Sequence, residues 1–295
     1  MRLPMIVAFV FCVLQSHVAA QDCAGAEGEP CQVASGQYRI ALPSGEASPD
    51  AMIWLHGMGG SANGVMKNKG MVRAVLERGM VLIAPDGLPM SETRKARNWT
   101  VNDGWSNARD EIAFLSEVID DAVARHGIDR DRILLGGFSR GGSMVWDVAC
   151  RAPDLARAYV PVAGAFWEPM WQDCEAPVDL FHTHGWTDRT VPLEGRPLRG
   201  GALVQGDVFQ SLYILRATNG CANRQPEDAP LSEAQDRWYR SWAACQGGRI
   251  DLMLHPGGHG IPKGWLGQAL DWFDARLEED CTELVAQSGV APACG

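Results

Sequence analysis

The ten residues ILLGGFSRGG, from Ile133 to Gly142, join an apolar run typical of a buried strand to a stretch with helical periodicity. Residues 137–141 within them, Gly-Phe-Ser-Arg-Gly, match the pattern G-x-S-x-G. Glycines on both sides of the serine permit a sharp turn, which lifts the Ser139 hydroxyl above a sheet and aims the following N–H at a reacting carbonyl. The same letters also fit a simple turn into a helix, with Ser139 or Ser143 as a capping residue. The pattern therefore makes Ser139 a candidate nucleophile that needs support from elsewhere in the chain.

Short apolar runs alternate with helix-like stretches along the chain. The runs that predict strands are Met52–Leu55, Val81–Ala84, Ile133–Gly136, Tyr159–Val162, Val178–Phe181 and Ile250–Leu254. The stretches that predict helices are Val65–Arg78, Arg109–His126, Gly142–Arg151, Ser232–Ala244 and Trp265–Glu279. This alternation predicts an α/β fold with a mostly parallel central sheet and helices on both faces. Ligands of such sheets bind beyond the carboxyl ends of the strands, so we expect chemical residues just after each run.

A glycine-rich segment, LHGMGG from Leu55 to Gly60, follows the first predicted strand. An acyl-transfer site needs two backbone N–H groups close to the developing oxyanion. We assign these two donors to Met58 and Arg140. An ordinary glycine-rich connection between a strand and a helix also explains the glycines, but it does not explain why they coincide with the serine turn.

Two later segments carry a carboxylate and an imidazole. The segment HGWTDRTVP, residues 184–192, contains Asp188, which can hold a catalytic imidazole in the correct tautomer. Capping a helix or pairing with Arg189 is the alternative for this aspartate. The segment GGHGIP, residues 257–262, places His259 on a loop after the last predicted strand, and we predict that His259 is the general base.

The other histidines are weaker candidates for the base. His255 is the nearest rival, whereas His126 is expected to end a helix. His182 and His184 alternate on or near a predicted strand, where a packed or hydrogen-bonded role is expected rather than metal ligation. With Ser139, Asp188 and His259 selected, the chain order is the Ser, Asp, His order of α/β-hydrolases.

The first twenty residues predict a secretory signal peptide. Arg2 precedes the apolar run Met5–Leu14, and Val18, Ala19 and Ala20 are small residues suited to cleavage. An uncleaved anchor or a buried N-terminal helix is the alternative, but the run is shorter than the roughly 20 residues that a membrane-spanning helix needs. We therefore expect a signal peptide over residues 1–20 and a secreted chain, extracellular or periplasmic, whose residues 21–295 form a single domain.

Eight cysteines follow the predicted signal peptide: Cys23, Cys31, Cys150, Cys174, Cys221, Cys245, Cys281 and Cys294. An even number in an oxidising compartment predicts up to four disulfides, although the sequence cannot choose among the many possible pairings. Pairing between nearest neighbours is our expectation. A zinc site is the alternative, but no two cysteines have the close C-x2-C spacing that such sites usually show, and we expect no metal.

The charge balance excludes one class of partner. The chain has 26 Lys and Arg against 36 Asp and Glu, a formal net charge of −10, and removal of Arg2 with the signal peptide changes this to about −11. An acidic surface repels phosphate backbones, so we expect no nucleic-acid partner. No later segment is long and apolar enough to span a bilayer, so we expect no stable membrane insertion. The sequence does not predict the oligomeric state.

Four tryptophans are candidate substrate contacts because they follow predicted strand ends or fall in predicted loops: Trp99, Trp105, Trp167 and Trp186. They are candidates to line an acyl-binding or sugar-binding cleft, and packing in the core is the alternative for each. Asn98-Trp99-Thr100 also matches an N-glycosylation acceptor, a frequent three-residue pattern to which we assign no role.

Together these segments resemble the secreted esterase family that includes polyhydroxybutyrate depolymerase-like proteins and feruloyl esterases of carbohydrate esterase family 1. The resemblance covers nearly the whole chain beyond residue 20, and its motifs are LHGMGG, PDG at residues 85–87, GFSRGG, HGWTDRTVP and GGHGIP. It implies an α/β-hydrolase fold, for which we expect no large lid domain, with Ser139, Asp188 and His259 as the catalytic triad. Arg140 departs from the pattern, since related turns often carry a smaller or uncharged residue there. Its side chain is expected to reshape the pocket or to attract an acidic substrate.

The resemblance implies a serine esterase that needs no metal or organic cofactor. The expected substrates are short hydroxyalkanoate oligoesters, or feruloyl and acetyl esters of plant polysaccharide, since we see no module that would hold an insoluble polymer. A serine peptidase of the prolyl-oligopeptidase type shares the triad, but it generally needs an extra domain for which this chain has no room. A non-catalytic secreted binding protein on the same scaffold is the other alternative, although every triad position is filled.

Overall fold

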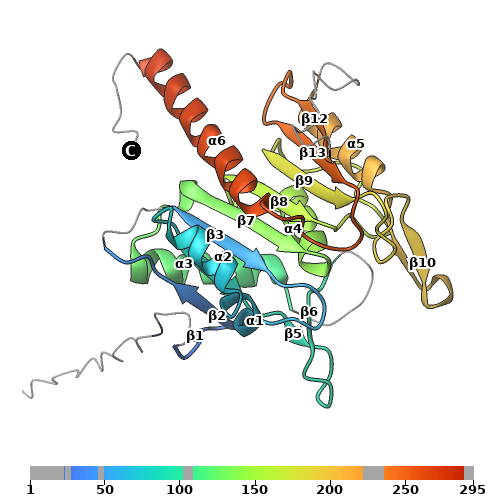
Figure 1. Ribbon diagram of the computed structural model, residues 1–295, viewed down its shortest axis with the longest axis horizontal. Helices are drawn as coiled ribbons and strands as arrows, with labels where there is room; N and C mark the ends of the chain where they lie inside the picture. Colours follow the sequence, from blue (N-terminus) through green and yellow to red (C-terminus); the bar gives the residue numbers. More distant parts are fainter. Residues whose placement is uncertain (1–22, 24–27, 46–49, 102–108, 222–235, 289–295) are drawn as a thin grey trace, which may run out of the picture.

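The computed structural model describes Cys23 and residues 28–45, 50–101, 109–221 and 236–288 (Figure 1). The predicted signal peptide, Trp105 and Cys294 lie outside these residues. The centre of the described part is a nine-stranded sheet with the strand order β1-β2-β4-β3-β7-β8-β9-β13-β12. Its strands are β1 (Cys31–Val33), β2 (Gly36–Ala41), β3 (Ala51–Leu55), β4 (Val81–Pro85), β7 (Ile133–Phe138), β8 (Ala158–Val162), β9 (Leu180–Gly185), β12 (Trp238–Trp242) and β13 (Ile250–His255).

The middle of the sheet is parallel and its two edges are antiparallel. Strands β4, β3, β7, β8, β9 and β13 pair in parallel, while β1 and β2 close one edge and β12 closes the other in antiparallel fashion. All residues of β3, β4, β8, β9 and β13 are buried. Parallel strands that are covered on both faces consist mostly of apolar residues. This is why these strands could be predicted from the sequence.

Helices cover both faces of the sheet, as the sequence predicts (Figure 1). One apolar core contains residues of α1 (Ala62–Met66), α2 (Lys69–Leu76) and α6 (Trp265–Ser288) packed against the sheet. The other core contains residues of α3 (Glu111–His126), α4 (Arg140–Arg151) and α5 (Val208–Thr218). None of the helices in the described ranges is both long and apolar enough to cross a membrane.

Shorter elements lie in the connections. Two antiparallel pairs form small separate sheets, β5 (Leu88–Pro89) with β6 (Arg97–Asn98) and β10 (Arg196–Leu198) with β11 (Leu203–Gln205). Arg130–Arg132 and Arg199–Gly201 form single turns of 3₁₀ helix. These elements come from segments with too few apolar residues to give a periodic signal.

All six predicted strands are found, although the one predicted at Val178–Phe181 is displaced toward the C-terminus as β9 (Leu180–Gly185), and two helix predictions need correction. Residues 238–242, inside the predicted helix Ser232–Ala244, form strand β12, whose alternating exposure is that of an edge strand with one buried face. The predicted helix Val65–Arg78 is two helices, because the side chain of Asn68 accepts a hydrogen bond from the Met71 N–H and starts α2. Helix α5 was not predicted.

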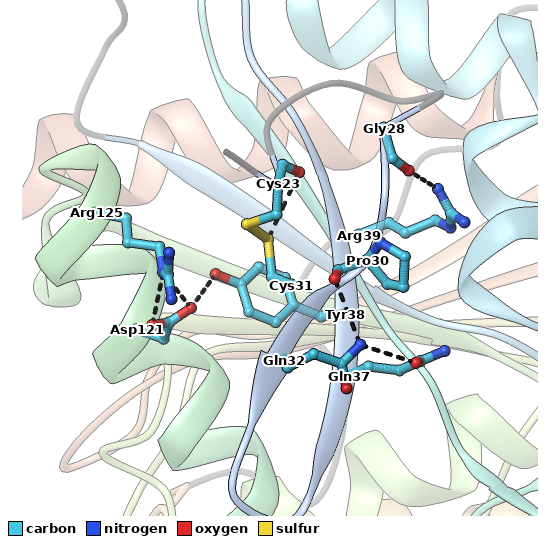
Figure 2. The surroundings of a disulfide bond; sticks show 10 residues. All are labelled: Cys23, Gly28, Pro30, Cys31, Gln32, Gln37, Tyr38, Arg39, Asp121 and Arg125. Carbon is cyan, nitrogen blue, oxygen red and sulfur yellow. Dashed lines mark hydrogen bonds and ion pairs between the residues drawn. A yellow bond between two sulfur atoms is a disulfide. The ribbon is translucent and has the colours of Figure 1, made fainter. Parts of the chain in front are cut away.

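Nearest-neighbour pairing is confirmed for three disulfides: Cys23–Cys31, Cys150–Cys174 and Cys221–Cys245. Cys281 is also disulfide-bonded. Figure 2 shows the first pair, which ties Cys23 to the start of β1 beside the ring of Tyr38. The Tyr38 hydroxyl donates to Asp121 of α3 over 2.7 Å, so the N-terminal hairpin is fastened to the helix that covers it.

Candidate active site

Ser139 occupies a strained turn between β7 and α4. Its φ of 57° and ψ of −119° lie in a region that a residue with a side chain rarely adopts. The Ser139 N–H donates to the Val162 carbonyl over 2.9 Å, which anchors the turn to the neighbouring strand β8. The Ser139 side chain makes no capping hydrogen bond to α4, and Ser143 accepts a hydrogen bond from Trp167 instead. Both serines therefore lack the capping role that was the alternative to catalysis.

The glycines of the motif permit close contacts between backbone segments. A Cβ atom on Gly141 would lie 2.2 Å from the Leu55 carbonyl oxygen, and one on Gly137 would lie 2.5 Å from the Gly141 oxygen. A Cβ on Gly142 would lie 2.6 Å from the Val162 oxygen. No side chain fits at these separations, so the start of α4 can press against the ends of β3 and β8 only because these residues are glycines.

The structure brings Ser139, His259 and Asp188 together from three distant segments. His259 Nε2 lies 2.9 Å from Ser139 Oγ, and His259 Nδ1 lies 2.7 Å from Asp188 Oδ2. Because a carboxylate only accepts, Nδ1 carries the proton and Nε2 is left to accept from the serine hydroxyl. The Asp188 side chain is fully buried, while that of His259 is 19% exposed. A hydroxyl, an imidazole and a carboxylate therefore form one hydrogen-bonded relay, in which the imidazole is partly open to solvent.

Asp188 is held as a carboxylate by several donors. Its Oδ1 accepts from the N–H groups of Thr190 and Val191 over 2.8 and 2.9 Å, and its Oδ2 accepts from His259. Burial alone would raise the pKa of Asp188, but the hydrogen bonds from His259, Val191 and Thr190 outweigh burial and lower the pKa. Within the described residues these contacts, rather than an ion pair with Arg189, account for the buried charge.

Behind Asp188 lies a buried chain of two further histidines on β9. His184 Nε2 faces the Val191 carbonyl at 2.8 Å and lies 3.5 Å from Asp188 Oδ2. His184 Nδ1 lies 3.0 Å from His182 Nε2, and His182 Nδ1 faces the Pro161 carbonyl at 3.1 Å. Burial lowers the pKa of both histidines. Their hydrogen-bonded role matches the sequence prediction, and the contact with Val191 adds support for the loop that holds Asp188.

His255, the rival base, serves a different neighbour. It ends β13 and its Nδ1 accepts from the Gly257 N–H over 3.1 Å. Among the described residues no contact joins it to Ser139. Burial lowers the pKa of His255, and its hydrogen bond to Gly257 shapes the start of the loop on which His259 stands.

The loop from His56 to Gly60 lies against Ser139 and is fixed by the His56 ring. A Cβ on Gly57 would lie 3.4 Å from the Ser139 Cβ. His56 Nδ1–H donates to the Gly57 carbonyl over 2.8 Å, and His56 Nε2 accepts from the Gly87 N–H over 3.0 Å. Burial lowers the pKa of His56, which keeps the ring in the neutral form that these two bonds require. Trp99 completes the support by donating its indole N–H to the His56 carbonyl over 2.7 Å.

The two N–H groups predicted as oxyanion donors lie on elements next to Ser139. Met58 is on the loop just described, and its N–H has no hydrogen-bond partner among the described residues. Arg140 is the first residue of α4, and the first N–H groups of a helix have no partner within the helix. The helix dipole adds a partial positive charge at the same place. The assignment of these two N–H groups as oxyanion donors stays a prediction.

The Arg140 side chain is buried and turns away from the relay. Its Nε donates to the Trp99 carbonyl over 3.0 Å, and its guanidinium lies 4.6 Å from the centre of the Trp167 ring. Arg140 and Trp99 line a small pocket together with Leu88, Pro89, Met90, Asn98 and Thr100. The expectation that Arg140 reshapes the substrate pocket or attracts an acidic substrate stays a prediction.

The candidate tryptophans differ sharply in exposure. Trp99 and Trp167 are only 1% and 5% exposed, and Trp167 donates its indole N–H to Ser143 over 3.1 Å. Trp186 is 56% exposed and is the tryptophan most open to a ligand among those described. Its ring meets that of Trp238, a residue that the sequence reasoning missed because it fell inside a wrongly predicted helix. In the described part, no group of three His, Cys, Asp or Glu side chains is placed to hold a metal ion.

Comparison with known proteins identifies a family and several relatives of this chain. The family described as phospholipase/carboxylesterase matches residues 37–199, a segment that contains Ser139 and Asp188 but ends before His259. The chain is 26% identical to a probable feruloyl esterase C of Aspergillus terreus over 196 residues, which are 62% of this chain and 66% of that protein. It is 27% identical to feruloyl esterase D of Neurospora crassa over 237 residues, 76% of this chain and 74% of that protein.

A solved structure shows the same arrangement of the chain. The acetyl xylan esterase from Aspergillus awamori superimposes with a TM-score of 0.57 at 16% identity, covering 80% of this chain and 93% of that chain. At this identity the likeness concerns the fold alone. The fold class predicted from the sequence, an α/β-hydrolase with a mostly parallel sheet, is confirmed.

Proposed function

Since the chain belongs to the phospholipase/carboxylesterase family, we propose that it is a serine esterase that cleaves carboxylic esters through an acyl-enzyme on Ser139. The observation that carries the proposal is the relay of 2.9 Å and 2.7 Å contacts from Ser139 through His259 to Asp188. A serine hydroxyl is a weak nucleophile until an adjacent base takes its proton. The base in turn needs a partner that fixes its tautomer, and buried Asp188 meets this need.

In the acylation half-reaction, Ser139 Oγ attacks the ester carbonyl carbon while His259 Nε2 takes the hydroxyl proton. A new C–O bond forms, and the carbonyl oxygen becomes an oxyanion that accepts hydrogen bonds from the N–H groups of Met58 and Arg140. Asp188 stabilises the imidazolium that now exists. When the tetrahedral intermediate collapses, the bond to the alcohol oxygen breaks and His259 returns the proton to the leaving alkoxide.

Deacylation repeats these steps with water in place of the serine. His259 takes a proton from the water as its oxygen attacks the acyl carbon, and the same donors hold the second oxyanion. The bond to Ser139 Oγ then breaks, His259 reprotonates the serine, and the carboxylic acid leaves. Every proton that His259 accepts is returned within the same half-reaction, so the relay ends in its starting state.

The substrate proposal follows the relatives. Two proteins to which this chain is similar are named feruloyl esterases, and a structural neighbour is named an acetyl xylan esterase. We propose feruloyl or acetyl esters of plant polysaccharide as substrates, with short hydroxyalkanoate oligoesters as the second class to be assayed. The disulfides support the proposal that the chain is secreted after cleavage of residues 1–20, since such bonds persist in oxidising compartments.

The test is Ser139→Ala in the purified protein, assayed with methyl ferulate and an acetylated xylo-oligosaccharide. The expected kcat is at least about 10⁴-fold lower than that of the wild type, because no other hydroxyl occupies the end of the relay. A fluorophosphonate probe should label the wild type and fail to label the variant. Ser91→Ala, on an exposed turn, is the matched control and should keep both activity and labelling. A folded Ser139→Ala protein that still turned over either ester would refute the assignment.

A further inference from the structure

Several large apolar side chains that remain open to solvent lie beyond the carboxyl ends of the strands. Among the described residues, four of the large apolar side chains that are most exposed lie on segments next to the carboxyl ends of β3, β9 and β13: Met58, Trp186, Trp238 and Ile261. Ser139, Asp188 and His259 also meet beyond the carboxyl ends of the strands. Exposed apolar groups that cluster beside a concave reactive site mark a surface that binds a ligand.

Trp186 and Trp238 form a pair within this group. Their ring centres lie 5.8 Å apart at an angle of 66°, an edge-to-face arrangement. Trp186 is 56% exposed and Trp238 is 43% exposed. Trp238 begins β12 opposite Leu254 of β13, and Trp186 follows directly after β9. Two strands that flank β13 on opposite sides therefore contribute one ring each.

The pair is fastened to the segment that leads to His259. The Trp186 N–H donates to the His255 carbonyl over 2.6 Å, and the Thr187 N–H donates to the Gly257 carbonyl over 3.1 Å. A Cβ on Gly185 would lie 2.2 Å from the Gly258 oxygen, so the two backbones touch. The backbone of Trp186 is thus held at a fixed position relative to the loop that carries His259.

The chemistry of the relay decides which half of an ester meets this pair. His259 must return its proton to the leaving alcohol, so the alcohol half lies on the side of His259. Trp186 is hydrogen-bonded to the segment that leads to His259, so we expect the tryptophan pair to border the alcohol half of the ester.

The groups around the indoles indicate the kind of alcohol. Thr187 and Arg189 are exposed beside Trp186, and Arg240 is exposed two residues from Trp238 and so on the same face of β12. Flat aromatic faces that cover C–H groups, with guanidinium and hydroxyl groups at their rims, suit a sugar ring, which is apolar on its faces and polar around its edge. An alkyl alcohol would leave these polar groups without a role.

We propose that Trp186 and Trp238 form a carbohydrate-binding subsite for the alcohol half of the ester. This inference rests on the proposed esterase function and narrows it, because it makes the substrate a sugar ester whose alcohol is recognised. The subsite acts in binding, since its residues are not part of the proton relay. Its loss should therefore raise KM for sugar esters and leave kcat nearly unchanged.

The first experiment compares two esters of the same acid, feruloylated xylotriose and methyl ferulate. Trp186→Ala and Trp238→Ala should each raise KM for the sugar ester about tenfold, as expected for the loss of one stacked ring, and change kcat less than about twofold. Kinetics with methyl ferulate should stay within about twofold of the wild type. Tyr213→Ala, which removes an exposed aromatic ring from α5, is the matched control and should leave KM and kcat unchanged for both esters. Equal effects on both esters, or no effect on either, would overturn the subsite.

The second experiment measures binding without turnover. In a Ser139→Ala background, xylotetraose should change the tryptophan fluorescence in a saturable manner, and Trp186→Ala or Trp238→Ala should weaken this binding about tenfold. Saturable xylotetraose binding to the Ser139→Ala variant, together with a wild type that hydrolyses no ester, would refute the esterase proposal and keep the subsite. Ester hydrolysis without xylotetraose binding would refute the subsite and keep the esterase proposal.

Discussion

At Ser139 the backbone itself is arranged for reactivity. A positive φ at a residue with a side chain costs free energy of order 1–3 kcal/mol, and the turn is kept because Ser139 N–H is bonded to Val162 and because the flanking glycines allow three backbone segments to touch. The same contacts prevent the turn from relaxing into a regular helix start. The hydroxyl is therefore presented to His259 before any substrate arrives, which is the condition for fast proton transfer.

Asp188 gives a prediction that separates catalysis from stability. Asp188→Asn should lower kcat about 10⁴-fold, because an amide can donate to His259 Nδ1 and favour the wrong tautomer. The lowered pKa of Asp188 in the folded protein means that its ionised form stabilises the fold at pH values above its ordinary pKa, and that this contribution is lost as the pH falls through the lowered value. The wild type should therefore lose more of its free energy of unfolding between about pH 5 and pH 2 than the variant does.

The measurement is urea unfolding at a series of pH values for both proteins, with Asp154→Asn on an exposed turn as the control. The control should follow the wild type in kcat and in the pH dependence of stability. Identical pH dependence for the wild type and Asp188→Asn would show that the carboxylate contributes nothing to the fold. Unchanged turnover in Asp188→Asn would remove it from the relay.

The sequence predicts the three relay residues because each follows a strand pattern and belongs to a dense local motif. It predicts a hydrogen-bonded role for His184, but not the partners through which His56 and His184 support the relay. His56 and His184 act through bonds to Gly87 and Val191 that only the folded chain brings within reach. Trp238 was missed for a different reason. Its segment mixes polar and aromatic residues, so the sequence did not predict the edge strand on which Trp238 is exposed.

At the scale of secondary structure, burial on both faces decides which elements the sequence reveals. The parallel strands are buried and were all predicted, mainly from short apolar runs, whereas β12 has one exposed face and its alternation over five residues was taken for part of a helix. Helix α4 was predicted with its end at Arg151, and its start at Arg140 follows from the serine turn. The sequence does not predict an element whose conformation depends on a neighbouring element. Strand β12, which forms by pairing with β13, is an example.

Two disulfides of equal span give a prediction for these elements. Cys150–Cys174 and Cys221–Cys245 each close a loop with a sequence separation of 24 residues. The loss of chain entropy in the unfolded state predicts that replacing either pair by serines costs about 3 kcal/mol. The first pair should cost more, because Cys150 is fully buried and a serine hydroxyl there must leave water.

Chemical unfolding of the two double serine variants tests this expectation. Turnover should persist in the Cys150→Ser, Cys174→Ser variant at low temperature, since Cys150 lies near the far end of α4 from Ser139. A smaller loss for the first pair than for the second would contradict the argument from burial. No loss for either pair would contradict the argument from loop entropy.

For the whole molecule, the parallel order of the central strands is what assembles the site. Strands β7, β9 and β13 end at the same edge of the sheet, so the turn with Ser139, the loop with Asp188 and the loop with His259 converge although up to 120 residues separate them. The nine-stranded sheet and its two apolar cores make this edge rigid. The central sheet therefore determines where the loops with Ser139, Asp188 and His259 lie relative to one another.

The net charge of the molecule gives the last prediction. A formal charge of −10 repels anionic substrates over a distance that salt controls, about 30 Å at 0.01 M and about 8 Å at 0.15 M. For an ester that carries a free carboxylate, such as monoethyl succinate, kcat/KM should rise a few-fold over this range of salt, while for neutral ethyl butyrate it should stay constant. If kcat/KM for the anionic ester falls instead, the local field of Arg140 and Arg189 near Ser139 outweighs the charge of the whole protein. Arg189→Gln removes an exposed cation next to Asp188. The decrease of kcat/KM with salt should then be smaller in this variant, because less positive charge is left to attract the anionic ester.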